Sequence, residues 1–266
     1  MNRLPDISFV IPLRVDFPER IRNILIVLDF INKNFDSEVI VLEADTERRF
    51  YPDINNKEIK YLFVEDKHPV FHRTKYLNLL YAMAVNPILA VWDTDMLLPA
   101  EQIEEAAQEI RQGKSVIAIP YNGYFYLTSD DLVCRYQALK DFNFLKGNVM
   151  NTMNGQLSVG GAFLVDREKY LKAGGENENF TGWGPEDVER LKRMEILYDK
   201  PVYQSAGCAY HLWHPRTNSR YVDSQDEIIH KQELLKICQM NKTELRKYIR
   251  NHLILNYINI WEWRKK

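Results

Sequence analysis

Short apolar runs alternate with amphipathic stretches along the chain as far as Pro120. The runs have the length of buried strands, whereas apolar residues in the stretches recur every three or four positions, the period of a helix. The predicted strands are Ser8–Ile11, Val39–Leu42, Tyr61–Val64, Ile88–Trp92 and Val116–Ile119. The predicted helices are Pro18–Asn34, one beginning near Thr74, and one with Ile103 to Ile110 on its inner face. This alternation predicts a three-layer α/β fold with a mostly parallel central sheet.

The pattern weakens after Pro120. The elements expected there are an exposed aromatic strand at Tyr121–Leu127, a helix from Ser129 toward Phe144, a loop at Asn148–Gln156, a strand at Gly160–Val165, and helices that begin at Asp166 and Pro185. Two helical segments follow, and Asn241 and Glu244 resemble a capping box at the start of the second. We therefore divide the chain into a main domain, residues 1–222, and a helical C-terminal appendage, residues 223–266.

The composition is that of an ordinary globular chain. Its 266 residues carry 35 Lys and Arg against 37 Asp and Glu, a net charge of −2. This balance argues against a dedicated nucleic-acid-binding protein, which carries a basic excess. The 3 cysteines are widely separated, so they form neither a disulfide framework nor a zinc-binding spacing. No signal region and no membrane-spanning run is visible, which predicts a cytoplasmic protein.

Two aspartates flank Thr94 directly after the predicted strand Ile88–Trp92. Ligands of open α/β sheets collect at the C-terminal ends of the strands. Asp93 and Asp95 have the spacing to hold a hard divalent cation that also bridges a diphosphate. The alternative is a polar loop with two solvated aspartates. The position at a strand end makes the two interpretations about equal.

A second acidic cluster is the sequence Gly182-Trp183-Gly184-Pro185-Glu186-Asp187. Proline suits the first turn of a helix, because its φ is already helical and it has no N–H to satisfy. Glu186 and Asp187 therefore fall in that turn, where the helix dipole favours ionised carboxylates. Dipole complementation explains the carboxylates but not the glycine-flanked Trp183, whose ring can serve the core, a sugar-binding surface or both.

His211 and His214 form a third cluster around Leu212 and Trp213. Two histidines at this spacing raise the prospect of a metal site above that of a lone structural histidine. Residues i and i+3 of an extended strand face opposite sides. Both imidazoles therefore reach one ion only if the chain turns, as Pro215 permits; otherwise one binds and the other packs. We expect one histidine to contribute more to metal affinity than the other.

The order of these clusters resembles that of metal-dependent glycosyltransferases of the GT-A fold. A D-x-D after a strand, a G-G strand, G-W-G-x-E-D and a histidine follow one another as in the β-1,4-galactosyltransferase family and related bacterial polysaccharide enzymes. Ile11-Pro12-Leu13-Arg14 is similar to the nucleotide-contacting I-P-F-R of that family, and Arg73-Thr74-Lys75 with Asn78 is similar to its N-R-A-K-x-x-N segment. The resemblance covers about Ile7 to Pro215 and implies a GT-A, Rossmann-like fold.

The resemblance also implies a role for each matching residue. Asp187 would be the general base. The residues implied at the acceptor are Glu186, Trp183 and Gly184. The residues implied at a Mn²⁺ (or Mg²⁺) ion are Asp95, Asp93, His211 and His214. The residues implied at the nucleotide sugar are Pro12, Leu13, Arg14, Glu43, Arg73, Lys75, Asp93, Thr94 and Gly161. Pro185 stands where the animal enzymes usually have a second glycine, which implies a stiffer acceptor loop.

We predict an inverting transfer of galactose or an N-acetylhexosamine from a UDP-sugar to a saccharide or glycolipid hydroxyl, in surface polysaccharide synthesis. A divalent cation would stabilise charge on the departing phosphate. A carboxylate that takes the hydroxyl proton would accelerate the reaction by ~10²–10⁴-fold. One alternative is a nucleotide-sugar or carbohydrate-binding module without catalysis. The other is a metal-dependent nucleotidyltransferase or phosphohydrolase, against which the lack of a P-loop argues.

The C-terminal segment mixes tryptophans with basic residues, namely Lys247, Arg250, Trp261, Trp263, Arg264, Lys265 and Lys266. This composition permits peripheral contact with an anionic membrane surface. We favour the alternative, a packed helix with a solvated basic end.

Overall fold

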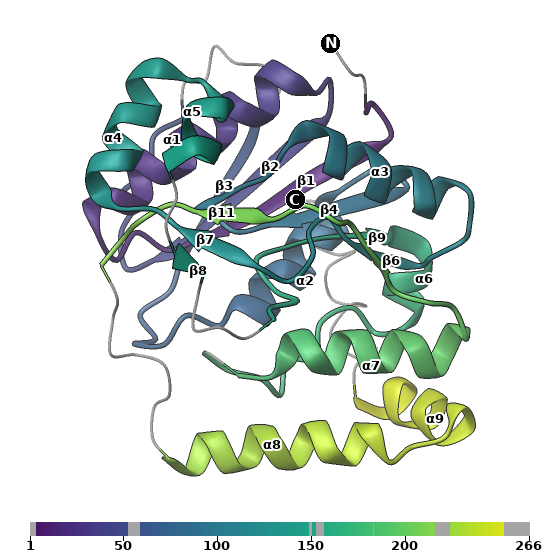
Figure 1. Ribbon diagram of the computed structural model, residues 1–266. Helices are drawn as coiled ribbons and strands as arrows, with labels where there is room; N and C mark the ends of the chain where they lie inside the picture. The colour runs from purple at the N-terminus through teal and green to yellow at the C-terminus, as the bar shows by residue number, and fades with distance from the viewer. Residues whose placement is uncertain are drawn as a thin grey trace.

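The computed structural model describes residues 4–52, 59–148, 151–152, 157–182, 184–215 and 224–252. Within these ranges the chain is built around a 7-stranded sheet (Figure 1). Its strands are β1 (Ile7–Leu13), β2 (Glu38–Asp45), β3 (Ile59–Glu65), β4 (Ile88–Trp92), β6 (Ile117–Ile119), β9 (Ala162–Asp166) and β10 (Tyr203–Gln204). They are ordered β10-β6-β9-β4-β1-β2-β3. The predicted α/β fold with a mostly parallel sheet is confirmed.

One strand of this sheet runs against the others. β9 pairs antiparallel with β4 and with β6, whereas the remaining neighbours pair in parallel. In the register of β4 and β9, Trp92 lies opposite Ala162. The first residues of β9 therefore meet the C-terminal end of β4, the edge at which ligands of α/β sheets collect.

Helices cover both faces of the sheet and connect its strands. They are α1 (Pro18–Asn34), α2 (Arg73–Met83), α3 (Ala100–Arg111), α6 (Arg167–Lys172) and α7 (Glu186–Tyr198). The sequence predicted α1 with the same bounds, because a proline opens it and its apolar spacing is regular. α2 packs on β1 and β2, and α3 packs on β6, β9 and β10.

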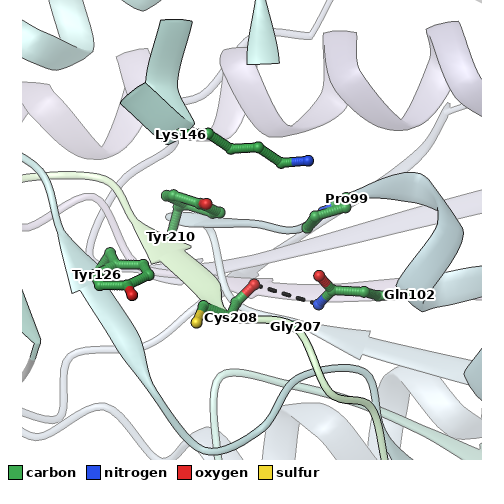
Figure 2. Close-up of a pocket in the computed structure, with 7 residues that line it drawn as sticks. All are labelled: Pro99, Gln102, Tyr126, Lys146, Gly207, Cys208 and Tyr210. Atoms are coloured by element: carbon green, nitrogen blue, oxygen red, sulfur yellow. Dashed lines mark hydrogen bonds between the residues drawn. The ribbon is translucent and has the colours of Figure 1, made fainter. Parts of the chain in front are cut away.

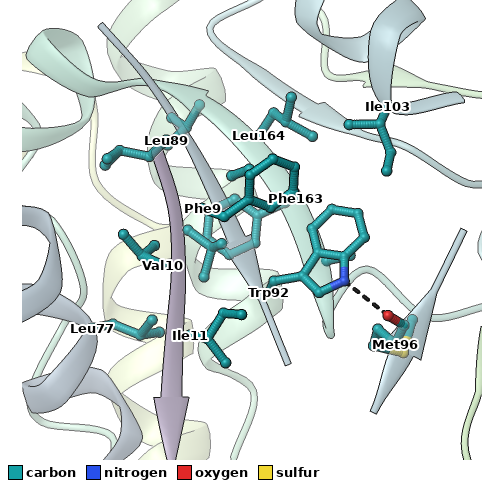
Figure 3. Packing of buried hydrophobic residues seen from close by; sticks show 14 of the residues in the cluster. Phe9, Val10, Ile11, Leu77, Leu89, Trp92, Met96, Ile103, Phe163 and Leu164 are labelled. Carbon is teal, nitrogen blue, oxygen red and sulfur yellow. Dashed lines mark hydrogen bonds between the residues drawn. The ribbon is translucent and has the colours of Figure 1, made fainter. Parts of the chain in front are cut away.

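The core lies between the central strands and these helices (Figure 3). Trp92 is fully buried, donates from Nε1 to the carbonyl oxygen of Met96 at 2.9 Å, and meets the ring of Phe9 edge to face at 5.5 Å. Because both faces of the central strands are covered, these strands appear in the sequence as continuous apolar runs.

A second sheet was not expected from the sequence. It contains β5 (Met96–Leu97), β7 (Phe125–Leu127), β8 (Asn151–Thr152) and β11 (Ala209–His211), in the order β5-β11-β7-β8. Two predictions were wrong here. The strand predicted to be exposed is shorter and partly buried, with Tyr121 fully covered, and the predicted loop Asn148–Gln156 contains β8. Strands of two or three residues are too short to leave a periodic signal in the sequence.

The helix predicted from Ser129 toward Phe144 is two helices, α4 (Asp130–Leu139) and α5 (Phe142–Asn148). Ser129 caps α4 as predicted, because its Oγ accepts from the backbone N–H of Leu132 at 3.2 Å. Lys140 ends α4 in the left-handed region at φ 54°, where few residues other than glycine are found. The prediction missed this break because lysine carries no helix-stop signal.

The C-terminal region described by the structure consists of α8 (Ser224–Cys238) and α9 (Lys242–His252). The predicted capping box is confirmed: the N–H of Asn241 donates to Glu244, and the N–H of Glu244 donates to Asn241. Both helices pack against α7. Among the helices described, none is long and apolar enough to cross a membrane.

Candidate functional site

The aspartate pair and the double glycine meet at the C-terminal end of β4. Asp93 follows β4 directly, and its backbone N–H donates to the carbonyl oxygen of Gly161, just before β9, at 2.8 Å. Gly161 has φ 79°, and a Cβ there would lie 3.1 Å from the ring of Phe125. A glycine is therefore needed at 161 for both backbone conformation and space.

Asp95, His211 and His214 form a compact cluster of metal-ligating side chains. Each offers a ligand atom within 4.8 Å of the others, and the Nε2 atoms of His211 and His214 lie 3.6 and 3.3 Å from the Asp95 carboxylate. β11 ends at His211, and the N–H of Leu212 donates to the carbonyl oxygen of Asp95 at 2.7 Å. Both imidazoles thus face one carboxylate. The geometric reason to expect unequal histidines is thereby removed.

The protonation of the cluster suits a cation. Burial opposes ionisation of Asp95, but interactions with His211 and Arg20 outweigh it and lower the pKa of Asp95 below its usual range. Burial lowers the pKa of His211, which favours the neutral ring with a free lone pair. One carboxylate and two imidazoles form a donor set that fits Mn²⁺ or a similar divalent cation.

Arg20, in the first turn of α1, forms an ion pair with Asp95 and donates to Oγ1 of Thr94 at 3.4 Å. Sequence reasoning missed this residue, because nothing near Arg20 in the chain marks it as part of the cluster. The arginine places a permanent positive charge beside the metal-ligating side chains.

Asp93 faces the first residue of α2. Arg73 donates to Oδ1 of Asp93 from Nη2 at 2.6 Å and from Nε at 3.1 Å. Burial raises the pKa of Asp93 despite Arg73, and the negative charges of Asp95 and Asp187 raise it further. Asp93 therefore lies within electrostatic reach of both the metal-ligating cluster and the acidic start of α7.

Glu186 and Asp187 occupy the first turn of α7, as predicted. Asp187 accepts from Nη1 of Arg190 at 2.7 Å, and its carboxylate lies against the backbone of Gly160. Glu186 is only 6% exposed. Burial, and then the neighbouring charge of Asp187, raise the pKa of Glu186 to about 8. Its Oε2 is buried and has no hydrogen-bond partner among the described residues.

A buried ion pair holds Arg190. Its guanidinium is fully buried and meets Glu176 at 3.0 Å, while Glu176 also accepts from the hydroxyls of Tyr81 at 2.7 Å and Tyr170 at 2.8 Å. Sequence reasoning missed both members of the pair. The i, i+3 spacing from Asp187 was the available signal for Arg190; Glu176 had none, because its partners come from other elements.

The predicted nucleotide-binding segment on β1 is only partly accessible. Pro12 and Leu13 are buried, whereas Arg14 is half-buried and forms an ion pair with Asp66 at 2.6 Å. Its Nε also donates to the carbonyl oxygen of Ala44 at 2.9 Å. Arg14 is therefore fixed at the end of β1.

Two other predicted nucleotide-binding residues, Glu43 and Lys75, lie in different surroundings. Glu43 is fully buried, and its carboxylate accepts from the backbone N–H groups of Arg49 at 2.9 Å and Phe50 at 3.2 Å and from the hydroxyl of Tyr61. These bonds hold the turn after β2 and leave the carboxylate directed into the fold. Lys75 is exposed beside the ring of Tyr76. Trp183 lies outside the described residues.

A cavity of about 380 Å³ lies elsewhere, beside the second sheet (Figure 2). Its lining residues are Pro99, Gln102, Tyr126, Lys146, Gly207, Cys208 and Tyr210. Within this lining, Nε2 of Gln102 donates to the carbonyl oxygen of Cys208 at 3.3 Å. The carboxylates and histidines described above are not part of this lining, so the cavity is separate from the site.

One family model matches the part of the chain that contains Glu186 and Asp187. Residues 150–197 match the family model described as the N-terminal domain of galactosyltransferase. This segment contains Gly160, Gly161, Glu186 and Asp187. Comparison with curated protein sequences gives no match.

Several solved structures are similar to this chain in fold. TarS of S. aureus, residues 1–349 in complex with UDP-GlcNAc, has a TM-score of 0.54 at 12% identity, over 96% of this chain and 72% of that chain. The mannosyltransferase PcManGT from Pyrobaculum calidifontis, with GDP-Man and Mn²⁺, has a TM-score of 0.53 at 12% identity, over 92% and 70%. GalNAc-T7 with UDP, GalNAc and Mn²⁺ has a TM-score of 0.58 at 11% identity, over 92% and 54%.

At these identities the structural likeness establishes the fold, and the match over residues 150–197 adds the galactosyltransferase sequence pattern at the position of the acidic pair. Both agree with the fold expected from the order of the sequence clusters. The chain has the GT-A fold, and its residues 150–197 carry the sequence pattern of a galactosyltransferase domain.

Proposed function

We propose that this chain is an inverting, metal-dependent transferase that moves a sugar from a UDP-sugar to a saccharide hydroxyl. The observation that carries the proposal is the position of Asp93. Its backbone N–H donates to the carbonyl oxygen of Gly161, the preceding Gly160 lies against Asp187, and Asp95 of the metal-ligating cluster follows two residues later. The metal-ligating cluster and the acidic first turn of α7 thus both lie close to Asp93, at the end of β4. A sugar at this point would have a diphosphate on one side and an acceptor on the other.

The donor side would be formed by Asp95, His211 and His214, which would hold Mn²⁺. When bound, the cation supplies a Lewis acid that stabilises negative charge on the departing diphosphate. Arg73 and Asp93, joined at 2.6 Å, would orient the donor sugar. TarS was solved with UDP-GlcNAc and GalNAc-T7 with UDP, GalNAc and Mn²⁺, which supports a UDP-linked galactose or N-acetylhexosamine as donor.

Asp187 would act as the general base on the acceptor side. The hydroxyl oxygen forms a bond to the anomeric carbon as its proton passes to Asp187, and the bond from that carbon to the diphosphate oxygen breaks. UDP leaves with the bonding electrons. Arg190 engages Oδ1 of Asp187, so the other oxygen has the free lone pairs. Attack from the face opposite the leaving group inverts the anomeric carbon.

Glu186 would bind the acceptor. A pKa near 8 means that this carboxyl keeps its proton through much of the neutral range, so Glu186 can donate as well as accept a hydrogen bond. Its Oε2 lacks a partner among the described residues, and buried polar atoms normally have one. An acceptor hydroxyl is a fitting partner. Trp183, although outside the described residues, is proposed to line the acceptor beside Gly184.

The acceptor is proposed to be a saccharide or a glycolipid used in surface polysaccharide synthesis. A glycolipid acceptor would require approach to a membrane from the cytoplasmic side. Of the basic and aromatic residues considered for peripheral membrane contact, Lys247 and Arg250 lie in α9. The others, Trp261, Trp263, Arg264, Lys265 and Lys266, lie outside the described residues.

The test is a panel of UDP-galactose, UDP-GalNAc, UDP-GlcNAc and UDP-glucose with Mn²⁺, incubated with p-nitrophenyl glycosides as acceptors. Product mass identifies the transfer, and NMR should show a β-glycoside from the α-linked donor. Asp187→Asn should lower kcat by ~10²-fold or more with UDP affinity unchanged. Glu186→Gln should act mainly on the acceptor KM. A product with retained configuration, or near-normal kcat in Asp187→Asn, would reject the proposal.

A further inference from the structure

One face of α8 holds the loop that leads into Glu186 and Asp187. Glu233 accepts from the side-chain amides of Asn177 at 2.9 Å and Asn179 at 3.0 Å. One helical turn earlier, Nε2 of His230 accepts from the backbone N–H of Thr181 at 3.2 Å. Since α8 also packs along α7, it supports both this loop and the helix that the loop enters (Figure 1).

His230 is 2% exposed and packs against Phe180, with ring centroids 5.5 Å apart. A neutral imidazole that accepts through Nε2 carries its proton on Nδ1. This Nδ1 lies 2.8 Å from the point where a Cβ on Gly184 would stand, and Oε2 of Glu186 lies 3.5 Å from the same point. The imidazole and the buried carboxyl of Glu186 thus both lie on the side of Gly184 where a side chain would stand.

The other side of the loop is held independently of α8. Oγ1 of Thr74 donates to the carbonyl oxygen of Phe180 at 2.9 Å, and Asn78 donates to the carbonyl oxygen of Glu176 at 3.0 Å. Both of these donors belong to α2. Loss of the His230 imidazole would therefore release Thr181 and Gly184 and leave the preceding part of the loop attached to α2.

We propose that His230 is a positioning residue for the acceptor in this glycosyltransferase. Its imidazole fixes the backbone of Thr181 and Gly184 and so sets the place at which Glu186 meets the acceptor hydroxyl. This inference rests on the proposed function. It adds α8 to the elements that shape the acceptor site. The metal-ligating residues Asp95, His211 and His214 lie on other elements, so they are expected to be unaffected.

Two substitutions of His230 and one control test the contacts of the imidazole. His230→Phe keeps a flat ring but removes both nitrogens. His230→Gln keeps an acceptor that can reach the Thr181 N–H. Leu235→Ala is the matched control, because Leu235 lies on the exposed side of the same helix at 58% exposure. Each is assayed with the donor and p-nitrophenyl acceptor on which the unaltered chain is active, together with direct binding of UDP and of Mn²⁺.

His230→Phe should raise the acceptor KM roughly tenfold, the effect of losing one buried hydrogen bond, with UDP and Mn²⁺ affinities within about twofold. His230→Gln should restore much of the loss, and Leu235→Ala should match the unaltered chain. Hydrogen exchange should quicken in peptides covering 177–186 for His230→Phe alone. An unchanged acceptor KM with unchanged exchange, or an equal loss in UDP affinity, would overturn the inference.

A double-substitution cycle keeps the inference testable if His230→Phe folds poorly. A Cβ from Gly184→Ala would press on the imidazole, and the flexible side chain of His230→Gln would relieve that pressure. If the two substitutions acted independently, their fold-increases in acceptor KM would multiply. The double variant should instead show a clearly smaller increase than that product. Independent effects would overturn the inference. Absence of transfer by the unaltered chain to any acceptor would instead reject the proposed function.

Discussion

Gly160 and Asp187 are in such close contact that a Cβ at position 160 would lie 1.9 Å from Oδ2 of Asp187. No side chain larger than hydrogen fits there unless the carboxylate moves. Arg190 restrains the other oxygen of Asp187 at 2.7 Å. The carboxylate is therefore placed between a fully buried guanidinium and the bare backbone that leads into β9.

Gly160→Ala is expected to displace the Asp187 carboxylate and to lower kcat on the order of 10²-fold, the cost of misplacing a catalytic group by about 1 Å. Gly160 is not among the glycines with positive φ, so alanine adds no backbone strain. Gly147→Ala is the matched control, because a Cβ there meets nothing within 4 Å. Steady-state kinetics with thermal unfolding check the result. A Gly160→Ala protein with normal kcat would show that Asp187 tolerates displacement.

Each of His211→Ala and His214→Ala is expected to weaken Mn²⁺ binding by ~10-fold or more, because both imidazoles face Asp95. Asp95→Asn should abolish binding. Isothermal titration with Mn²⁺ measures the three affinities, and His68→Ala, at an exposed position outside the cluster, is the control. A large loss in one histidine variant only would restore the unequal roles expected from an extended strand. Full activity in excess chelator would remove the metal from the mechanism.

Glu186 should make the protein less stable as the pH rises. Its pKa of about 8 in the folded chain exceeds the ordinary glutamate value of 4.5, so the folded state holds the proton more tightly than the unfolded state does. The associated stability is fully present below about pH 4.5 and is lost as the pH rises through 8, at no more than about 1.4 kcal/mol per pH unit.

Glu186→Gln should therefore flatten the fall in the free energy of unfolding between pH 5 and 8. Urea unfolding of both proteins at several pH values in this window measures the difference in slope. Asp187→Asn should shift the fall to lower pH, because the charge of Asp187 is the second cause of the raised pKa. Parallel curves for the unaltered chain and Glu186→Gln would contradict the prediction.

Glu176→Gln should destabilise the fold by about 3–5 kcal/mol, because it removes the buried counter-ion of Arg190 and leaves only the partly exposed Asp187 to pair with the buried guanidinium. Glu195→Gln is the control: its ion pair with Lys192 is exposed and should contribute less than about 1 kcal/mol. Urea unfolding compares the two variants. Equal stabilities would show that Asp187 and Tyr170 suffice to hold Arg190.

Much of the fold was predictable because its signals are local. The apolar face of α1, the runs that became β1, β2 and β4, the Ser129 cap and the capping box at Asn241 each lie within a few consecutive residues. The break at Lys140 and the second sheet were missed, because neither leaves a periodic pattern.

The candidate site divides in the same way. The sequence determined that two aspartates end a strand and that Glu186 and Asp187 begin a helix, since spacing along the chain decides these placements. Tertiary structure alone decided which residues meet. The antiparallel β9 brings Gly160 to Asp187, and β11 brings two histidines to Asp95. The contacts of Arg190, Glu176 and His230 were also decided by the tertiary structure. They join segments that are distant in the chain and depend on how the elements pack, which a local sequence pattern cannot predict.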